Sequence, residues 1–336
     1  MKRLIENRVH IPGIHCGSVT LRDVMTFYGH PWTEEMCFGI GGGLGFYYTV
    51  GEEISPTHMI FMRGPGMEPS FFSLVVGRTG WKHAEAGRAV ETVKGIIDRG
   101  IPAIIQTDIF YLHYYKSSTH FPGHIISVWG YDDGKGEMYV ADTQFEGLKT
   151  VSYDDLAESM ESSAPPNPLH NNYLDITVPK ELRPLSELAP EAIRINARNM
   201  LGGVTGGRGE SAVRLIKTWA DDVPSWKDVH DWKWCARFGY QVIKKRGVGG
   251  AGFRWIYRDF LREAEAISPG LTWLGLSEKM DRIGERWSDA ADLLKEISER
   301  EKPEKALLKK ASAIAAEIYE METEYYNYVL EKLGGK

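Results

Sequence analysis

The chain has few cysteines, no long apolar run and little excess charge. Three cysteines among 336 residues (Cys16, Cys37 and Cys235) are too few and too widely spaced for a disulfide framework or a zinc site. No stretch approaches the ~18 apolar residues of a membrane-spanning helix, and the N-terminal segment lacks the apolar run of a secretion signal. We therefore expect a cytoplasmic protein with reduced thiols, no membrane partner and no bound metal.

The charge of the chain also argues against nucleic-acid binding. The formal net charge is -6 at pH 7, and the basic residues are scattered rather than gathered in a stripe. Hydrophobic residues make up 43% of the sequence, which is enough for a substantial core. The length fits two domains better than one, and oligomeric state stays open.

The sequence divides into two regions of different character. Residues up to about 178 contain short runs that resemble strands, separated by glycine and proline. These runs are FFSLVVG (71–77), IPAIIQTDIF (101–110), HIISVWGYD (124–132), EMYVADT (137–143) and LDITVP (174–179). Later residues have helical periodicity over 188–201, 209–222, 226–246, 252–266, 275–300 and 303–333. We predict an α+β domain over 1–180 and an all-α domain over 185–336, joined by VPKELRPLS (178–186).

Cys16 is the first candidate for chemistry. It stands directly before a helical apolar pattern that extends from Gly17 to Tyr28. A thiol at a helix N-terminus meets unpaired backbone N–H groups and the positive end of the helix dipole, which favour the thiolate. The N–H of Cys16 is then a donor for an oxyanion, and Gly17 lets a substrate approach the backbone. The alternative is that Cys16 is a small buried apolar residue.

His124 and Asp142 are the candidate partners of this thiol. They lie on two strands joined by a turn at 133–136, and pairing Tyr131 with Met138 places Asp142 opposite Ser127. Asp142 then reaches His124 only if the strand pair is sheared or contains a bulge. Taken singly, the histidine could be structural and the aspartate could cap a turn. The order of thiol, imidazole and carboxylate is that of papain-like cysteine enzymes, so we predict a papain-like catalytic domain.

Three further residues are candidates near this centre. Papain-like enzymes place an oxyanion-donating glutamine six positions before the cysteine, and His10 occupies that position here. Gly42 and Gly43 belong to GIGGGLGFYYT (39–49), which lacks the Lys-Ser/Thr of a phosphate-binding loop. We predict that these glycines line a substrate site, because they let a ligand approach the backbone.

Longer blocks of the sequence resemble a known family. The segments HCGSVTLRDVMTFYGHPWTEEMCFGIGGGLGFYY (15–48), IPAIIQTDIFYLHYY (101–115), HIISVWGYDD (124–133) and YVADT (139–143) resemble the N-terminal domain of butirosin biosynthesis protein H. The helical second half is similar to a domain of unknown function that accompanies it. More distantly, the Cys, His and Asp blocks resemble peptidases that cut double-glycine leader peptides.

This resemblance implies an acyltransferase that moves an aminoacyl group from an acyl carrier protein thioester to an aminoglycoside amine. Cys16 would accept the acyl group, His124 would act as base and then acid, and Asp142 would orient it. Asp108 and Tyr111 match an Asp-x-x-Tyr block and would bind the acceptor amine or line the pocket, unless they only form a turn at a strand end.

The implied partners are an acyl carrier protein or acyl-CoA donor and a small amine acceptor. No cofactor would stay bound, because the phosphopantetheine thioester is the acyl donor, and Arg63, Arg78 and Lys82 are candidates for a basic rim that meets an acidic carrier. Gly17 replaces a larger residue of many relatives and is closer to the peptidase pattern. Two alternatives therefore stay open: a papain-like cysteine peptidase or amidohydrolase, and a non-catalytic binding protein on the same fold.

Overall fold

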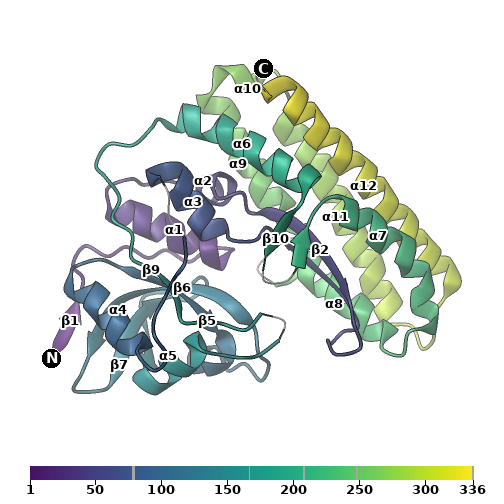
Figure 1. The fold of residues 1–336 in the computed structure, drawn as a ribbon. Helices are drawn as coiled ribbons and strands as arrows, with labels where there is room; N and C mark the ends of the chain where they lie inside the picture. Colours follow the sequence, from purple (N-terminus) through teal and green to yellow (C-terminus); the bar gives the residue numbers. More distant parts are fainter. Residues whose placement is uncertain (78–79, 166, 207–208, 247–248, 335–336) are drawn as a thin grey trace. The chain divides into compact units, whose positions relative to one another are not determined.

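The chain folds into two compact units (Figure 1). The structure, a computed structural model, describes residues 1–77, 80–165, 167–206, 209–246 and 249–334. The first unit comprises Met1–Cys37 and Glu68–Leu182, and the second comprises Phe38–Met67 and Arg183–Lys336. The boundary between the two units after Leu182 therefore lies between residues 180 and 185, where the predicted domains end and begin. Residues 38–67, which the sequence analysis assigned to the first domain, belong with the helical second unit.

An antiparallel sheet forms the centre of the first unit. Within the described residues its strands follow the order β4-β9-β5-β6-β7-β8, and β1 pairs with β6. The strands are β1 (Lys2–Leu4), β4 (Lys82–His83), β5 (Ala103–Asp108), β6 (Pro122–Asp132), β7 (Glu137–Ala141), β8 (Lys149–Ser152) and β9 (Asn172–Leu174). The helical segments are α1 (Cys16–Phe27), α3 (Met67–Val76), α4 (Ala89–Asp98), η1 (Ile109–Tyr111), η2 (His113–Tyr115) and α5 (Tyr153–Met160). Helix α2 (Glu34–Ile40) spans the division at Cys37.

Strand β6 is the most deeply buried element of this sheet. Every residue from Pro122 to Tyr131 is buried, and both α1 and α4 pack against the strand. A strand covered on both faces is apolar without alternation, and Ile125, Ile126 and Val128 fit that pattern. The core thus fixes the backbone of β6, whose third residue is His124.

The hairpin of β6 and β7 contains a β-bulge, so its residue pairing differs from the simple register. Tyr131 pairs with Met138 as predicted, but Ser127 pairs with Ala141 because the register shifts between Val128 and Gly130. A bulge adds one residue to one strand and so displaces everything beyond it. Asp142, which follows Ala141, therefore lies one position closer to His124 than an unbulged hairpin allows.

One predicted strand of the first unit is wrong, and a second is correct only at its first residue. The run FFSLVVG lies in helix α3, where Phe71, Phe72 and Val75 are buried on one helical face. A short apolar run without alternation does not distinguish a buried strand from a buried helix. In LDITVP only Leu174 belongs to a strand, β9. IPAIIQTDIF forms β5 and η1, as its β-branched residues indicate.

The second unit is mainly helical. Its helices are α6 (Leu185–Gly202), α7 (Arg214–Asp222), η3 (Val223–Asp228), α8 (Trp232–Lys244), α9 (Arg254–Ile267), α10 (Pro269–Thr272), α11 (Leu276–Ser298) and α12 (Lys305–Leu333). Among its described residues, strand β2 (Leu44–Val50) pairs with β3 (His58–Arg63), and β10 (Val204–Gly206) pairs with β11 (Gly209–Ser211). The unit is therefore not all-α. Helices predicted from 209 and 226 begin later, because 209–211 are β11 and the chain is extended at Val229.

A buried ion pair crosslinks three helices of this unit. Glu322 of α12 accepts hydrogen bonds from Arg254 Nε of α9 at 2.8 Å and Nη2 at 3.0 Å. Trp287 Nε1 of α11 donates to the same carboxylate at 2.6 Å. Both charged side chains are fully buried, so each charge depends on its partner for the solvation it has lost.

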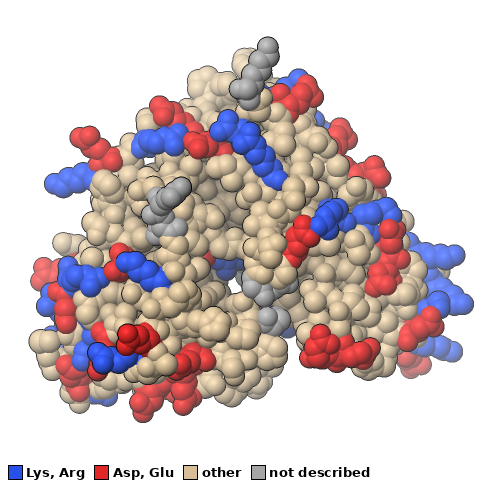
Figure 2. Space-filling model, viewed as in Figure 1, with Lys and Arg blue, Asp and Glu red and all other residues tan. Residues whose placement is uncertain are grey.

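Surface charges of both signs are mixed. On the face shown in Figure 2, acidic and basic side chains lie interspersed rather than sorted by sign. Among the described helices, none has both the length and the apolar character that crossing a membrane requires.

Candidate active site

The structure brings His124 and Asp142 into direct contact. His124 Nε2 lies 2.8 Å from Asp142 Oδ1, and the two residues are almost fully buried, at 6% and 1% exposure. His124 comes from the start of β6, and Asp142 directly follows β7. The β-bulge between these strands supplies the shift that the simple register lacked. This contact orients the imidazole ring through one of its two nitrogens.

Cys16 completes a hydrogen-bonded group with these residues. It is the first residue of α1, is half-buried, and its side chain is hydrogen-bonded to that of His124. Since Nε2 of the imidazole contacts Asp142, Nδ1 is the ring nitrogen left for the thiol. His15 is the N-cap of α1 and accepts a hydrogen bond from Ser18 N through its own Nδ1. That cap fixes the first turn on which Cys16 stands.

The charges of this group favour an ionised pair. Burial lowers the pKa of His124, but the charges of Asp142 and Cys16 and the hydrogen bonds to both outweigh it and raise the pKa to about 10. Burial raises the pKa of Asp142, yet the charge of His124 and three hydrogen bonds lower it below its ordinary value. An imidazolium beside Cys16 in turn stabilises a thiolate.

Two tyrosines that the sequence analysis did not assign also contact Asp142. Tyr114 OH donates to Oδ2 at 2.7 Å, and Tyr115 OH donates to Oδ1 at 3.0 Å. Tyr115 OH also lies 3.3 Å from His124 Nε2. The sequence signal was present, because both tyrosines end the block IPAIIQTDIFYLHYY, but nothing in their spacing identifies a partner on β7.

Glu34 holds the segment that leads into Cys16. Its carboxylate accepts hydrogen bonds from the N–H of Ile14 at 3.0 Å, the N–H of His15 at 2.7 Å and the hydroxyl of Ser18 at 3.1 Å. Gly13 leaves the space for this approach, since a Cβ there would lie 2.2 Å from Glu34 Oε2. Burial raises the pKa of Glu34 despite these bonds. The backbone before the thiol is thus fixed by a side chain from α2.

His10 is not placed as the predicted oxyanion donor. Its Nδ1 lies 2.5 Å from Asp23 Oδ2 on α1, and its Nε2 lies 2.9 Å from the carbonyl oxygen of Phe145. Burial lowers the pKa of His10, but its bonds to Asp23 and Phe145 raise it above the ordinary value. With both nitrogens facing acceptors, the ring donates twice and has no N–H left for a substrate.

Asp108 is placed as a structural residue. Its carboxylate caps η1 through Phe110 N and accepts from His120 Nδ1, Ser162 Oγ and Phe121 N. Burial raises the pKa of Asp108, but these bonds lower it overall. Four donors leave this fully buried carboxylate little capacity for an acceptor amine. Tyr111 is half-buried, and its ring contacts Phe110 and His120.

The predicted glycines have different positions. Gly17 is the second residue of α1 and is buried beside Cys16. Gly42 and Gly43 end α2: Gly42 has φ +66°, Gly42 N donates to Gly39 O, and Gly43 N donates to Phe38 O. This pair of bonds is a Schellman helix end, which needs a residue with positive φ. Gly42 and Gly43 belong to the second unit, and their helix-ending role explains them without a ligand.

Comparison with protein families now adds to this geometry. The family model described as "Butirosin biosynthesis protein H, N-terminal" matches residues 15–143, and the model "Domain of unknown function (DUF4872)" matches residues 154–329, more than half of the chain. The chain therefore belongs to the family that this domain of unknown function defines, and its first part is similar to the N-terminal domain of butirosin biosynthesis protein H. No curated protein matches it. The first of these matches suggests an enzyme of secondary metabolism.

The match to the N-terminal domain of butirosin biosynthesis protein H covers the whole hydrogen-bonded group. The match begins one residue before Cys16 and ends one residue after Asp142, and both tyrosines lie inside it. His10 lies outside the matched residues. The match to the domain of unknown function begins inside α5, which belongs to the first unit, so the family boundary and the structural division differ.

The other cysteines and the predicted basic residues have different surroundings. Cys37 and Cys235 are buried, and burial raises the pKa of Cys235 to about 12, which disfavours its thiolate. Within the described part of the chain, no three His, Cys, Asp or Glu side chains form a group that could hold a metal ion. Of the predicted basic rim, Lys82 is paired with Asp175, Arg63 belongs to the second unit, and Arg78 lies outside the described residues.

Proposed function

We propose that the chain is a cysteine-dependent acyltransferase in which Cys16 carries the acyl group. The observation that supports this is the hydrogen-bonded group of Cys16, His124 and Asp142, with its imidazolium stabilised by two neighbouring charges. The order of helix N-terminus, strand and next strand agrees with a papain-like domain. The match of residues 15–143 to the butirosin biosynthesis protein H domain supports a place in secondary metabolism.

The reaction would proceed in two balanced steps. Cys16 thiolate attacks the thioester carbonyl, the new sulfur–carbon bond forms, and the donor thiol leaves with the proton of His124. An amine then attacks the Cys16 thioester while His124 takes its proton, and the thiolate of Cys16 leaves. Asp142 keeps the imidazole oriented through both steps. The donor would be the phosphopantetheine thioester of an acyl carrier protein or CoA.

The start of α1 would stabilise the oxyanion of each step. The N–H groups of Cys16 and Gly17 lie in the first turn of α1, at the positive end of the helix dipole. Their dipoles point at a negative charge that develops beside the sulfur. His10 would not take part, because its two nitrogens are bound elsewhere.

The test is formation of the acyl-enzyme. The chain is incubated with acetyl-CoA, butyryl-CoA or an acylated carrier protein, and intact mass shows whether one acyl group is added. We expect an adduct that is absent from Cys16→Ala, is retained in Cys37→Ala, and disappears when an amine is added, with formation of the amide.

Other outcomes would identify the competing functions. Adduct formation from peptide or amide substrates, with release by water alone, would indicate the peptidase or amidohydrolase. An adduct that persists in Cys16→Ala refutes the proposal, as does the lack of any adduct with every thioester and amide. The second result would leave a binding protein on the same fold.

A further inference from the structure

The carboxylate of Asp142 has two phenolic donors in addition to the imidazole. Tyr114 OH donates to Oδ2 at 2.7 Å, while Oδ1 is shared between Tyr115 OH at 3.0 Å and His124 Nε2 at 2.8 Å. Among the described residues, Tyr114 is the side chain that donates to Oδ2. The groups that face Asp142 are therefore one imidazole from β6 and two phenols from η2.

The two tyrosines stay neutral donors at every working pH. Burial raises the pKa of Tyr114 well above its ordinary value, and the negative charge of Asp142 raises it further. Burial and Asp142 raise the pKa of Tyr115 in the same way. A neutral hydroxyl that donates to a buried carboxylate stabilises its charged form and so lowers the pKa of the carboxyl.

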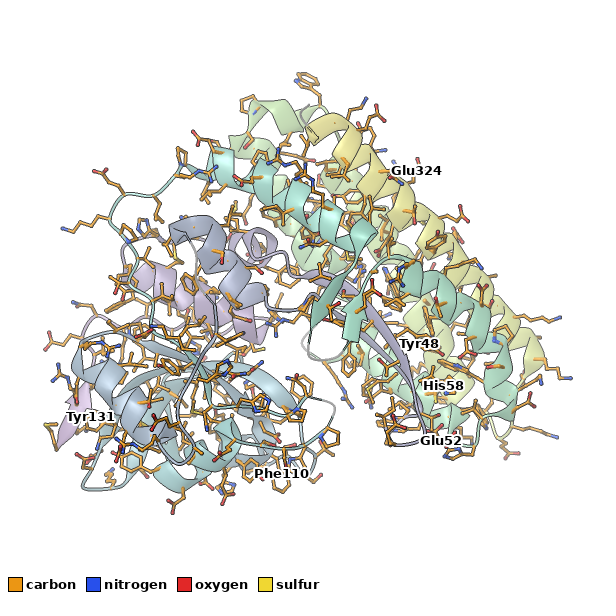
Figure 3. All side chains as sticks on the ribbon, viewed as in Figure 1. Tyr48, Glu52, His58, Phe110, Tyr131 and Glu324 are labelled. Atoms are coloured by element: carbon orange, nitrogen blue, oxygen red, sulfur yellow. The ribbon has the colours of Figure 1, made fainter. Side chains whose placement is uncertain are left out.

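Packing fixes the position of both rings. They follow each other in η2, in the segment between β5 and β6 in which Phe110 is labelled in Figure 3. The ring of Phe145 packs edge-on against each of them, with centroids 5.0 Å apart in both cases. Phe145 N also donates to the backbone oxygen of Asp142. The phenols and the carboxylate are thus held by the same residue.

We propose that Tyr114 and Tyr115 form a clamp that fixes the rotamer and the ionised state of Asp142, and are positioning residues of the Cys16–His124 pair. The inference rests on the proposed function of that pair. Tyr114 has the larger effect, because its loss leaves Oδ2 of a buried carboxylate without the donor recorded for it. Loss of Tyr115 leaves Oδ1 its bond to His124.

The experiment measures the rate at which iodoacetamide alkylates Cys16 across pH, with the modified peptide identified by mass. Tyr114→Phe should slow alkylation about tenfold at acid pH, at about pH 4, the usual effect of one hydrogen bond to a charged group. The low-pH side of the rate curve of this variant, its acid limb, should move about one pH unit higher, because Asp142 then takes up a proton more readily. Tyr115→Phe should lie between the parent and Tyr114→Phe, and all curves should converge near pH 10.

The matched control is Tyr153→Phe. Tyr153 OH donates to Asp133 Oδ1 at 2.9 Å in the same unit, so the substitution removes the same kind of bond away from the site. It should leave the alkylation curve unchanged. A merely structural role would lower the melting temperature of Tyr114→Phe without moving its acid limb.

Two results would overturn the inference. One is an unshifted acid limb in folded Tyr114→Phe, or in Tyr115→Phe if the first variant does not fold. The other is an equal shift in Tyr153→Phe. Failure of the proposed function is separate, because it appears in the parent chain as the lack of an acyl adduct on Cys16, whatever the alkylation curves show.

Discussion

Replacing Asp142 by asparagine tests the electrostatics of the site most directly. Asparagine keeps the shape of the side chain but removes its negative charge. His124 is 6% exposed, so in Asp142→Asn its burial would be opposed mainly by the charge of Cys16. We therefore expect the pKa of His124 to fall from about 10 toward its ordinary 6.5.

The size of the effect follows from that shift. A rise in the pKa of His124 from 6.5 to about 10 corresponds to about 5 kcal/mol in favour of the imidazolium, as an order of magnitude. Asp142 and Cys16 share this energy, so removing Asp142 should cost the pair roughly 2–3 kcal/mol, or about a hundredfold in its population. The reactive thiolate near neutral pH should decline by the same factor.

Alkylation by iodoacetamide measures this population without a known substrate. Below about pH 7 the Asp142→Asn rate at Cys16 should be about a hundredfold lower, while near pH 10 the two curves should meet because the thiol ionises unaided. The control is Asp98→Asn, because Asp98 also accepts a bond from a tyrosine hydroxyl, that of Tyr131 at 2.8 Å. Equal rates for a folded Asp142→Asn and the parent below pH 7 would refute the reasoning.

The same pair predicts how stability depends on pH. The folded pKa of His124 is raised, so its stabilising contribution is complete below its unfolded value of 6.5 and is lost as pH rises through about 10. The folded pKa of Asp142 is lowered, so its contribution is present above about pH 4 and is lost as pH falls further. Both contributions are complete between about pH 4 and pH 6.5, so the difference in melting temperature between the parent and Asp142→Asn should be largest in that range.

Two further predictions concern stability, measured by urea unfolding. Gly13→Ala should cost roughly 1–3 kcal/mol, because its Cβ would lie 2.2 Å from Glu34 Oε2, whereas Gly95→Ala, whose Cβ meets nothing within 4 Å inside a helix, should stabilise by about 0.5–1 kcal/mol. Equal effects of both would contradict the close approach. Arg254→Met should cost about 3–5 kcal/mol by leaving the Glu322 charge unpaired, and adding Glu322→Leu should recover most of it. Failure of the second substitution to recover stability would contradict a purely electrostatic cost.

The position of the site could be predicted from the sequence only as far as local patterns reach. The helix after Cys16 and the hairpin between His124 and Asp142 follow from periodicity and turn residues. The contact between His124 and Asp142 depends on the β-bulge between Val128 and Gly130. Gly130 stands at the bulge, but a glycine inside a strand indicates either a bulge or a close approach of another backbone, so the sequence alone does not fix the register.

Contacts between distant segments were beyond the reach of the sequence. Tyr114 and Asp142 are 28 residues apart, and nothing in either pattern links a short η2 to the end of β7. The same limit explains His10, where counting six positions back from Cys16 indicated an oxyanion donor. The count did not consider Asp23 of α1, whose carboxylate binds one imidazole nitrogen of His10.

The hydrogen bonds of His10 give the site a second connection between the helix that carries Cys16 and the segment that carries Asp142. One nitrogen binds Asp23, a buried residue of the helix that begins with Cys16, and the other binds the carbonyl of Phe145. Phe145 N–H in turn donates to the backbone oxygen of Asp142. The thiol and the carboxylate are thus connected through His124 at the reacting atoms and through His10 at the backbone. Two independent connections between the same elements restrict the relative motion that a single hydrogen bond would allow, and a hydrogen-bonded thiol–imidazole pair depends on that restriction.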